Sequence, residues 1–165
     1  MTELRSIPKA DIPQIIDIYE EGLALGYATF NTVPPAPETW DAGHHPFCRV
    51  GAYEGDLLVG WTALSPVSAR ECYRGVAEVS LYIRDGYRGR GIGSRLMAAL
   101  IPESEANGIW TLYASITSTN AASIQMCLKN GWRVIGTRER IAKDRFGAWQ
   151  DTTILERRSS TVGAE

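Results

Sequence analysis

The chain has 165 residues, enough for one domain with a substantial hydrophobic core. Its 17 Lys and Arg residues against 19 Asp and Glu give a net charge of −2, which argues against a broad basic face for nucleic acid. No apolar stretch approaches the roughly 20 residues that cross a bilayer, and residues 1–9 contain no apolar signal-peptide core. We therefore expect neither a nucleic-acid nor a membrane partner.

The first half of the chain is predicted to consist mainly of strands. A short strand over 3–7 ends at Pro8, and Asp11 then caps a helix whose apolar residues recur at helical spacing: Ile12, Ile15, Ile16, Tyr19 and Leu23. A proline-rich loop over 28–40, with room for a short helix after it, leads to a hairpin of strands over 49–53 and 57–64. After a polar loop over 66–74, residues 76–84 form the clearest strand. Its apolar alternation slips near residues 78–80, which permits a bulge.

The second half of the chain alternates between strands and helices. A helix begins at about Gly91, and Pro102 is expected to kink or restart it because proline lacks a backbone N–H. A strand over 110–116 precedes a helix over 120–129 that Asn120 caps. Closing strands follow at 132–136, 139–142 and 149–156. We expect a single domain over 1–158, with a mixed α/β sheet between helices, and a disordered tail over 159–165.

The cysteines and histidines of the chain show no metal or disulfide pattern. Cys48, Cys72 and Cys127 are odd in number and widely spaced, as expected of a protein in the reducing cytoplasm. His44 and His45 are adjacent, whereas two metal ligands on one helix face stand four residues apart. We therefore expect no metal.

A glycine- and arginine-rich loop, Arg88-Gly89-Arg90-Gly91-Ile92-Gly93-Ser94, lies between the 76–84 strand and the next helix. The N–H groups at a helix start have no intrahelical partner and lie at the positive end of the helix dipole. Glycines let the backbone approach an anion, and the two arginines add positive charge. The loop is therefore a candidate pyrophosphate cradle, the alternative being a plain turn with solvated arginines. The Rossmann pattern fails because Ser94 stands where it requires glycine, and no Lys-Ser/Thr pair completes a P-loop.

Four further stretches add to the pattern Arg88-x-x-Gly91-x-Gly93: Thr29-Phe30-Asn31-Thr32, Glu78-Val79-Ser80-Leu81-Tyr82, Asn120-Ala121-Ala122-Ser123 and Phe146-Gly147-Ala148-Trp149-Gln150-Asp151. The loop pattern resembles the acetyl-CoA loop of the GNAT superfamily. The whole chain resembles the phosphinothricin N-acetyltransferase group, which includes methionine sulfoximine and arsinothricin acetyltransferases. This resemblance implies the GNAT acyl-CoA N-acyltransferase fold, an α/β (α+β) fold with a mixed, mostly antiparallel central sheet flanked by helices. It also implies acetyl-CoA as co-substrate and a homodimer.

The resemblance gives roles to residues of the 76–84 strand and the glycine loop. Glu78 is expected to act as general base for the acceptor amine, directly or through water, the alternative being a solvent-facing or ion-paired glutamate. Ser80 shares its face and relays a proton or binds substrate. An N–H group at 81–83 is expected to bind the oxyanion. The expected cofactor-binding residues are Leu81, Tyr82, Ile83, Arg88, Gly89, Arg90, Gly91, Ile92, Gly93, Ser94 and Asn120.

The general acid is the point at which the chain departs from the resembling family. Cys127 stands where the family places a His or Tyr that protonates the CoA thiolate. A thiol with an ordinary pKa near 8.5 is protonated at pH 7 and able to donate. We favour the alternative that Cys127 is a small buried hydrophobe, with water or Tyr113 serving the thiolate.

The acceptors of the resembling family are amino acids with a carboxylate and an anionic or polar tail. Such molecules need cations, and arginine suits bidentate recognition of oxyanions. Arg70 and Arg74 precede the strand that carries Glu78, so we expect them to reach the same cleft. Phe30 and Trp149 are candidates for the wall of the substrate pocket.

The predicted function is transfer of acetyl from acetyl-CoA to the α-amine of a small amino acid analogue, in detoxification or resistance. Phosphinothricin, methionine sulfoximine and arsinothricin are the candidate acceptors. Val67-Ser68 stand where many members carry Trp-Arg, which favours the arsinothricin branch. Two alternatives stay open: an acetyltransferase for peptide or protein N-termini, and a catalytically degenerate CoA-binding module.

Overall fold

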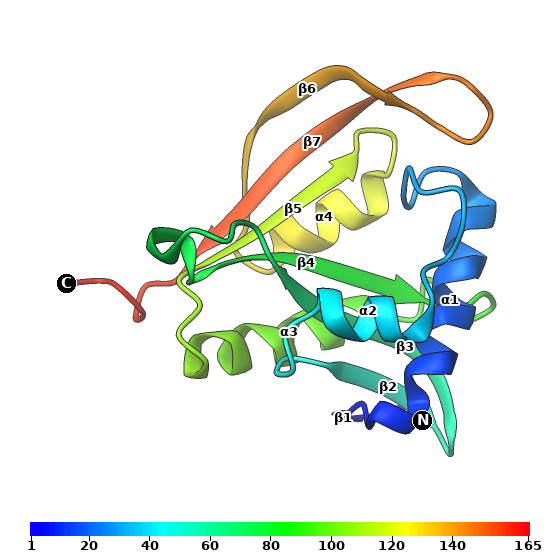
Figure 1. Ribbon diagram of the computed structural model, residues 1–165, viewed down its shortest axis with the longest axis horizontal. Helices are drawn as coiled ribbons and strands as arrows, with labels where there is room; N and C mark the ends of the chain where they lie inside the picture. The colour runs from blue at the N-terminus through cyan, green and yellow to red at the C-terminus, as the bar shows by residue number, and fades with distance from the viewer.

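The computed structural model describes residues 1–165 as one seven-stranded sheet with helices on both faces (Figure 1). The strands are β1 (Glu3–Ser6), β2 (Val50–Glu54), β3 (Leu57–Pro66), β4 (Val76–Ile83), β5 (Thr111–Thr117), β6 (Arg133–Lys143) and β7 (Trp149–Arg158). The helices are α1 (Ile12–Leu25), α2 (Pro37–Gly43), α3 (Ile92–Ala106) and α4 (Ala121–Lys129), with short 3-10 turns at Lys9–Asp11 and Glu71–Tyr73. None of these helices has the length and apolar character that crossing a membrane requires.

The sheet has the order β1-β2-β3-β4-β5-β7-β6, and only the β4–β5 pair is parallel. This confirms the mixed, mostly antiparallel sheet. The parallel pairing is short, since Val76–Glu78 pair with Thr111–Tyr113 and no residue beyond them does. The centre of the sheet therefore contains two strands that start together and then separate.

Helices cover both faces of the sheet. On one face, α1 and α2 pack against β2 and β3 in a cluster that includes Ile15, Ile18, Trp40, Tyr53 and Trp61. On the other face, α3 and α4 contribute Leu96, Met97, Leu100 and Cys127 to two further clusters. The core thus continues on both sides of the sheet up to the place where β4 and β5 part.

The β4 strand is regular, and the predicted bulge is absent. Its register with β3 is unbroken from Ile83, opposite Gly60, to Ala77, opposite Pro66. The slip in the sequence is only apparent, because the alternation begins one residue inside the strand, after Val76. The residues that pack against the α3 and α4 clusters are Ala77, Val79, Leu81 and Ile83. Glu78, Ser80 and Tyr82 consequently share the face toward α1.

Two other elements differ from the sequence predictions. Helix α3 continues through Pro102 to Ala106 instead of restarting there. The carbonyl that loses its N–H partner belongs to exposed Ala98, where water can satisfy it. The strands expected at 132–136 and 139–142 form one strand, β6, with two breaks of register. At the second break Arg140 takes a positive φ of 49°, and its N–H donates to the Asp151 carboxylate at 2.8 Å.

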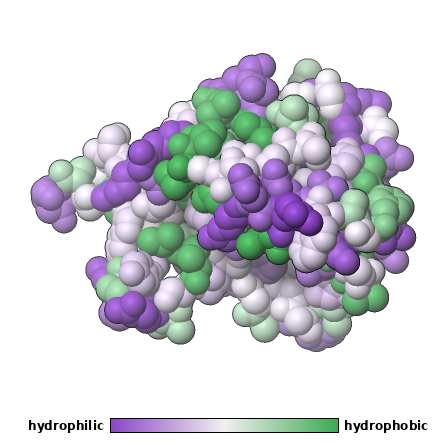
Figure 2. Space-filling model, turned by 90° about the horizontal axis from the view of Figure 1, so that it is seen from above, coloured by the Kyte–Doolittle hydropathy of each residue, from purple (hydrophilic) through white to green (hydrophobic).

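The β6–β7 hairpin forms the upper part of the molecule in Figure 1, and β6 is an edge strand. Figure 2 looks down on this side and shows hydrophobic patches among hydrophilic ones. The exposed apolar residues of the hairpin are Val134, Ile135, Ile141, Phe146 and Trp149. After β7, the Arg158 guanidinium donates to the carbonyls of Ser159, Val162 and Gly163. The assignment of 159–165 as a tail outside the domain stays a prediction.

Candidate active site

A cleft of about 790 Å³ lies where β4 and β5 separate. Its walls come from the end of α1 with the loop after it, from β4, from the glycine loop with the start of α3, and from β5 with α4. The cleft brings together most of the residues that the sequence singled out: Phe30, Glu78, Ser80, Leu81, Tyr82, Ile83, Arg88, Gly89, Gly91, Gly93, Ser94, Asn120 and Cys127.

The glycine loop has the backbone conformation of an anion cradle. Gly89 and Gly91 have positive φ angles of 74° and 75°, and Gly91 is the N-cap of α3. Nothing lies within 4 Å of a β-carbon built on either residue, so this part of the loop is open. At Gly93 a β-carbon would lie 2.8 Å from the Met126 sulfur, so a larger residue would have to displace the Met126 side chain between α3 and α4. Free N–H groups at the start of α3 therefore face an open, glycine-walled space.

Two residues of the loop point elsewhere. Arg90 does not line the cleft, and its guanidinium lies 4.8 Å from the centre of the Tyr87 ring. The Ile92 side chain is 3% exposed and packs in the core beside Val50 and Ala52, so only its backbone is available at the helix start. Arg88 does line the cleft, and Asp85 holds it through a 3.2 Å ion pair.

Glu78 is the carboxylate at the base of the cleft. Burial raises the pKa of this half-buried group, and none of the eight salt bridges of the chain includes it. A carboxylate that is unpaired and has a raised pKa is suited to accept a proton near neutral pH. Ser80 lines the cleft on the same face.

Tyr82 has a packing role in addition to lining the cleft. Its ring lies 5.1 Å from the ring centres of both Trp61 and Tyr19, and its hydroxyl donates to the Ala28 carbonyl at 3.4 Å. Burial raises the pKa of the Tyr82 phenol, which keeps it neutral. The ring thus connects β4 to α1 and to the loop that follows α1.

The structure favours a packing role for Cys127. The residue is 2% exposed and lies in the core cluster beneath α4, although its surface also touches the cleft. Burial raises the pKa of its thiol to about 11. An unperturbed thiol has a pKa of about 8.5, so donation from Cys127 to such a thiolate is uphill by roughly 3 kcal/mol. Tyr113, the other candidate donor, does not line the cleft.

Asn120 occupies the position that the sequence predicts. It is the N-cap of α4, and its side-chain oxygen accepts the Ser123 N–H at 3.4 Å. The cap and the glycine loop both line the cleft.

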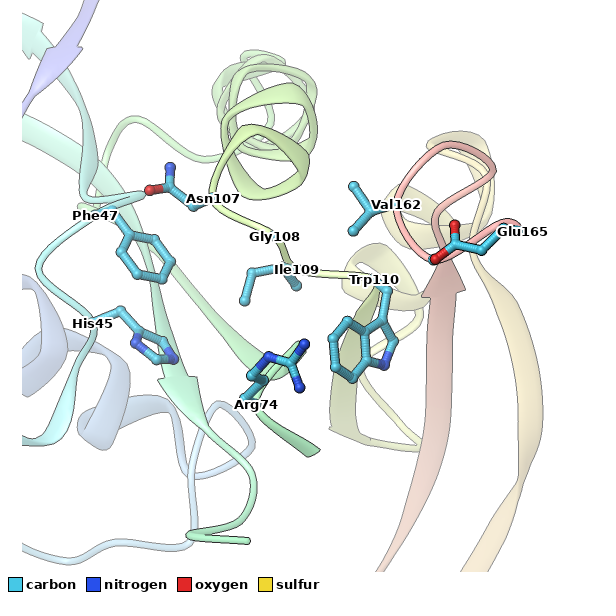
Figure 3. Close-up of a pocket in the computed structure, with 10 residues that line it drawn as sticks. His45, Phe47, Arg74, Asn107, Gly108, Ile109, Trp110, Val162 and Glu165 are labelled. Carbon is cyan, nitrogen blue, oxygen red and sulfur yellow. The ribbon is translucent and has the colours of Figure 1, made fainter. Parts of the chain in front are cut away.

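Arg70, Arg74 and Trp149 lie outside the cleft. Arg74 faces a second pocket, together with His45 and Trp110 (Figure 3). Its guanidinium lies 3.5 Å from Glu71 and 5.4 Å from the Trp110 ring centre.

The reason for this placement of Arg74 is local. A β-carbon at Gly75 would lie 2.0 Å from the Trp110 ring, so this glycine brings the end of the preceding loop onto Trp110, just before β5. The Arg70 guanidinium lies over the Tyr73 ring, and the exposed Trp149 ring lies near the cations of Arg140 and Lys143. Arg88 is the only Arg or Lys that lines the cleft.

A hydrogen-bonded cluster of Tyr19, Thr29 and Asn31 lines the cleft and was missed by the sequence reasoning. The Asn31 amide donates to the Tyr19 hydroxyl at 2.6 Å, and this hydroxyl lies 3.2 Å from that of Thr29. Tyr19 fitted the apolar spacing of a helix, and only Phe30 was selected from the 29–32 stretch. The sequence signal for this cluster is the Tyr19 hydroxyl, because a buried Tyr hydroxyl needs a hydrogen-bond partner nearby.

Comparison with known proteins identifies the family of the chain. The profile of the Acetyltransferase (GNAT) family matches residues 12–132. The chain is 31% identical to the L-methionine sulfoximine/L-methionine sulfone acetyltransferase of Pseudomonas paraeruginosa, over 93% of this chain and 92% of the relative. It is 30% identical to the phosphinothricin N-acetyltransferase of Streptomyces coelicolor, over 94% of this chain and 95% of the relative.

A solved structure shares the fold. It is the GNAT superfamily phosphinothricin acetyltransferase of Sinorhizobium meliloti in complex with acetyl-CoA, with a TM-score of 0.89 and 26% identity over 99% of this chain and 91% of the other. With the family profile covering most of the chain and the predicted sheet confirmed, the protein belongs to the GNAT acetyltransferase family and is an N-acetyltransferase.

Proposed function

We propose that this enzyme moves acetyl from acetyl-CoA to the α-amine of a small amino acid analogue. The observation that carries the proposal is the single cleft that joins the glycine cradle to an unpaired, half-buried Glu78. The names of the relatives support phosphinothricin- and methionine sulfoximine-type acceptors. Val67-Ser68, in place of the Trp-Arg of many family members, supports an arsinothricin-type acceptor. The biological role is detoxification or resistance.

The cofactor site consists of the residues that fit a pyrophosphate. Gly89 and Gly91 leave room for the anion beside the free N–H groups of α3, and Arg88 adds charge. Gly93 and Asn120 line the same cleft. When bound, acetyl-CoA supplies an activated thioester. The backbone of β4 beyond Glu78 has no partner in β5, so the N–H groups within 81–83 that point away from β3 are free to bind the pantetheine arm and the developing oxyanion.

Glu78 acts as the general base. Its carboxylate takes a proton from the α-ammonium of the acceptor, which leaves the amine free to attack. Ser80, on the same face, hydrogen-bonds the acceptor or relays this proton, and Phe30 forms part of the wall. Water, rather than Cys127, protonates the departing thiolate. Binding of the acceptor carboxylate by Arg70 or Arg74 stays a prediction, because neither residue lines the cleft of its own chain.

We further propose that the enzyme is a cytoplasmic homodimer. Its three cysteines are free thiols, which suits a reducing compartment. A second copy would cover the edge strand β6, where Ile135 and Ile141 are each 50% exposed. Light scattering of the eluted peak gives the mass, and Ile135→Lys with Ile141→Lys is expected to convert a dimer to a monomer. A wild-type mass of one chain at micromolar concentration would contradict the dimer.

An acceptor screen tests the proposed activity. CoA release is followed with phosphinothricin, methionine sulfoximine, methionine sulfone, arsinothricin and peptide amines, at fixed acetyl-CoA. We expect turnover with at least one free amino acid analogue and much less with peptides. Turnover with peptides alone would favour the N-terminal acetyltransferase. Binding of acetyl-CoA without turnover of any acceptor would favour the degenerate module.

A further inference from the structure

The stretch Phe146–Asp151 carries part of the family resemblance, yet none of its residues lines the cleft. It belongs to the tip of the β6–β7 hairpin, which lies beside the C-terminal end of α1 although more than 100 residues separate the two in sequence (Figure 1). This contact links the β6–β7 end of the sheet to a helix that packs on the sheet face over β3 and β4. The link calls for an explanation that catalysis does not supply.

The tip is a built structure rather than a loose loop. The Asp144 carboxylate accepts the N–H groups of Phe146 and Ala148 at 2.9 and 3.0 Å, and the Gln150 amide at 2.7 Å. These hydrogen bonds lower the pKa of Asp144. Gly147 turns the chain at a φ of 85°, which glycine adopts without strain. The orientation of the two residues in between, Arg145 and Phe146, is therefore fixed.

Arg145 and Phe146 both meet the end of α1. The Arg145 guanidinium donates at 3.0 Å to the Leu23 carbonyl, which also accepts the Gly26 N–H at 3.2 Å in the last turn of α1. Gly26, the C-cap, has a φ of 79°, which favours glycine, and a β-carbon there would lie 2.7 Å from the Phe146 ring and 3.4 Å from the Arg145 side chain. The helix end and the hairpin tip are therefore in direct contact.

The residues that follow Gly26 form one wall of the cleft, from Tyr27 to Asn31. At their far end, the Asn31 and Thr29 side chains hydrogen-bond to Tyr19 on α1. Ala28 accepts a hydrogen bond from Tyr82, two residues from Ser80 on the same face of β4. This segment contacts the face of β4 that Glu78, Ser80 and Tyr82 share, and it is held at its end by α1 and at its start by the hairpin tip.

We propose that the hairpin tip, residues Asp144–Ala148, is a latch that holds residues 27–31 in position over the acceptor half of the cleft. Arg145 and Phe146 are positioning residues: they touch neither reactant and act through the end of α1. The inference rests on the proposed function in one respect, namely that the acceptor binds on the Glu78 side. It explains why residues far from the cofactor belong to the same pattern as the catalytic strand.

The test compares Arg145→Ala with Arg145→Lys, which keeps a donor for the Leu23 carbonyl, and with Arg138→Ala. Arg138 is exposed on the same hairpin and makes no hydrogen bond to α1. In Arg145→Ala we expect faster hydrogen exchange at the 26–31 amides and an acceptor KM raised by about 3- to 10-fold, since a charged hydrogen bond that orders the wall is lost. The Kd of acetyl-CoA is expected to stay within about twofold of wild type. In Arg145→Lys, the exchange rate at 26–31 and the acceptor KM are both expected to stay close to the wild-type values. Arg138→Ala is expected to change neither the exchange rate nor the KM.

The two readouts separate the latch from the proposed function. Exchange at 26–31 is measured without any acceptor, so faster exchange supports the latch even if the acceptor class is wrong. Unchanged exchange in Arg145→Ala overturns the latch even if the amino acid analogues are acetylated. A parallel loss of acetyl-CoA binding, or equal exchange increases throughout the chain, also overturns it, because the residue would then support the fold as a whole.

Discussion

Glu78 pairs with Tyr113 as the last residue pair before β4 and β5 separate. The cleft opens where this pairing ends, so the Glu78 carboxylate lies at the closed end of the cleft. From the same point onward the backbone of β4 has no hydrogen-bonding partner in β5. The separation of the two strands therefore provides both the candidate base and the free N–H groups. This relationship leads to the first two predictions.

Replacement of Glu78 by Gln is expected to lower kcat by about 10²- to 10⁴-fold, the usual contribution of a positioned general base. The Kd of acetyl-CoA, measured by calorimetry, should change little because the glycine loop is intact. Burial disfavours the charged carboxylate, so the Tm of the variant at pH 7 is not expected to fall. Glu139→Gln, at an exposed position on β6, is the matched control. Full activity in Glu78→Gln would remove the base from the mechanism.

The pH profile follows from the direction of the Glu78 shift. A general base works only when it is deprotonated, and burial raises the pKa of this carboxyl above its ordinary 4.5. The wild-type kcat/KM should therefore fall as the pH drops through that raised value, in addition to any fall caused by the acceptor amine. In Glu78→Gln the acidic limb that belongs to the carboxyl should disappear. Identical limbs in both proteins would assign the titration to another group.

Cys127→Ala is expected to keep kcat within about fivefold of wild type, because a thiol with a pKa of about 11 is a poor donor to a CoA thiolate. Its main effect should be on stability, about 1 kcal/mol for the loss of a small buried group. Chemical denaturation measures the loss of stability, and steady-state kinetics measures kcat. A several-hundredfold fall in kcat in both Cys127→Ala and Cys127→Ser would show that Cys127 is the acid after all.

Gly91→Ala tests the cradle against a closely matched position. Gly91 and Gly86 have φ angles of 75° and 79°, and no atom lies within 4 Å of a β-carbon at either one. Alanine at either position therefore costs about 1–2 kcal/mol of backbone strain. Only Gly91 lines the cleft, so only Gly91→Ala should raise the Kd of acetyl-CoA, by about tenfold or more. Equal Kd values in the two variants would mean that the loop does not hold the cofactor.

Most of the fold could be predicted because its signals are local. The spacing of Ile15 and Tyr19 marks α1, Asn120 caps α4 as expected, and turn residues separate the strands. The errors arose where the outcome depends on distant groups. Pro102 stays inside α3 because the affected carbonyl is exposed to water, and β6 passes through its breaks because Asp151 on the next strand holds Arg140.

The place of the glycine loop in the cleft could also be predicted, since one continuous stretch of chain forms it. The acceptor side could not, because it is assembled from α1, the loop after it, and β4. Sequence proximity to Glu78 suggested that Arg74 joins the cleft, whereas the contact between Gly75 and Trp110 brings it to another pocket. Tyr19 is remote from Glu78 in the sequence, and its helical spacing is that of a core residue. That spacing therefore offers no reason to place Tyr19 in the cleft.

Gly22 decides how closely β4 and α1 approach each other in this assembled half of the site. Alanine in a helix interior is favoured over glycine by about 1 kcal/mol, which alone would stabilise the protein. A β-carbon at Gly22, however, would lie 2.9 Å from two carbons of the Tyr82 ring, which is confined between Trp61 and Tyr19. Such overpacking costs about 1–3 kcal/mol. We expect Gly22→Ala to lower the Tm and to raise the acceptor KM.

Gly43→Ala is the control for helix propensity, because nothing lies within 4 Å of a β-carbon at Gly43, the last residue of α2. Thermal unfolding should place Gly43→Ala at or above the wild-type Tm and Gly22→Ala below it. If both variants gain stability equally, the Tyr82 ring yields to the new methyl group, and the close contact between β4 and α1 is not what shapes the acceptor side.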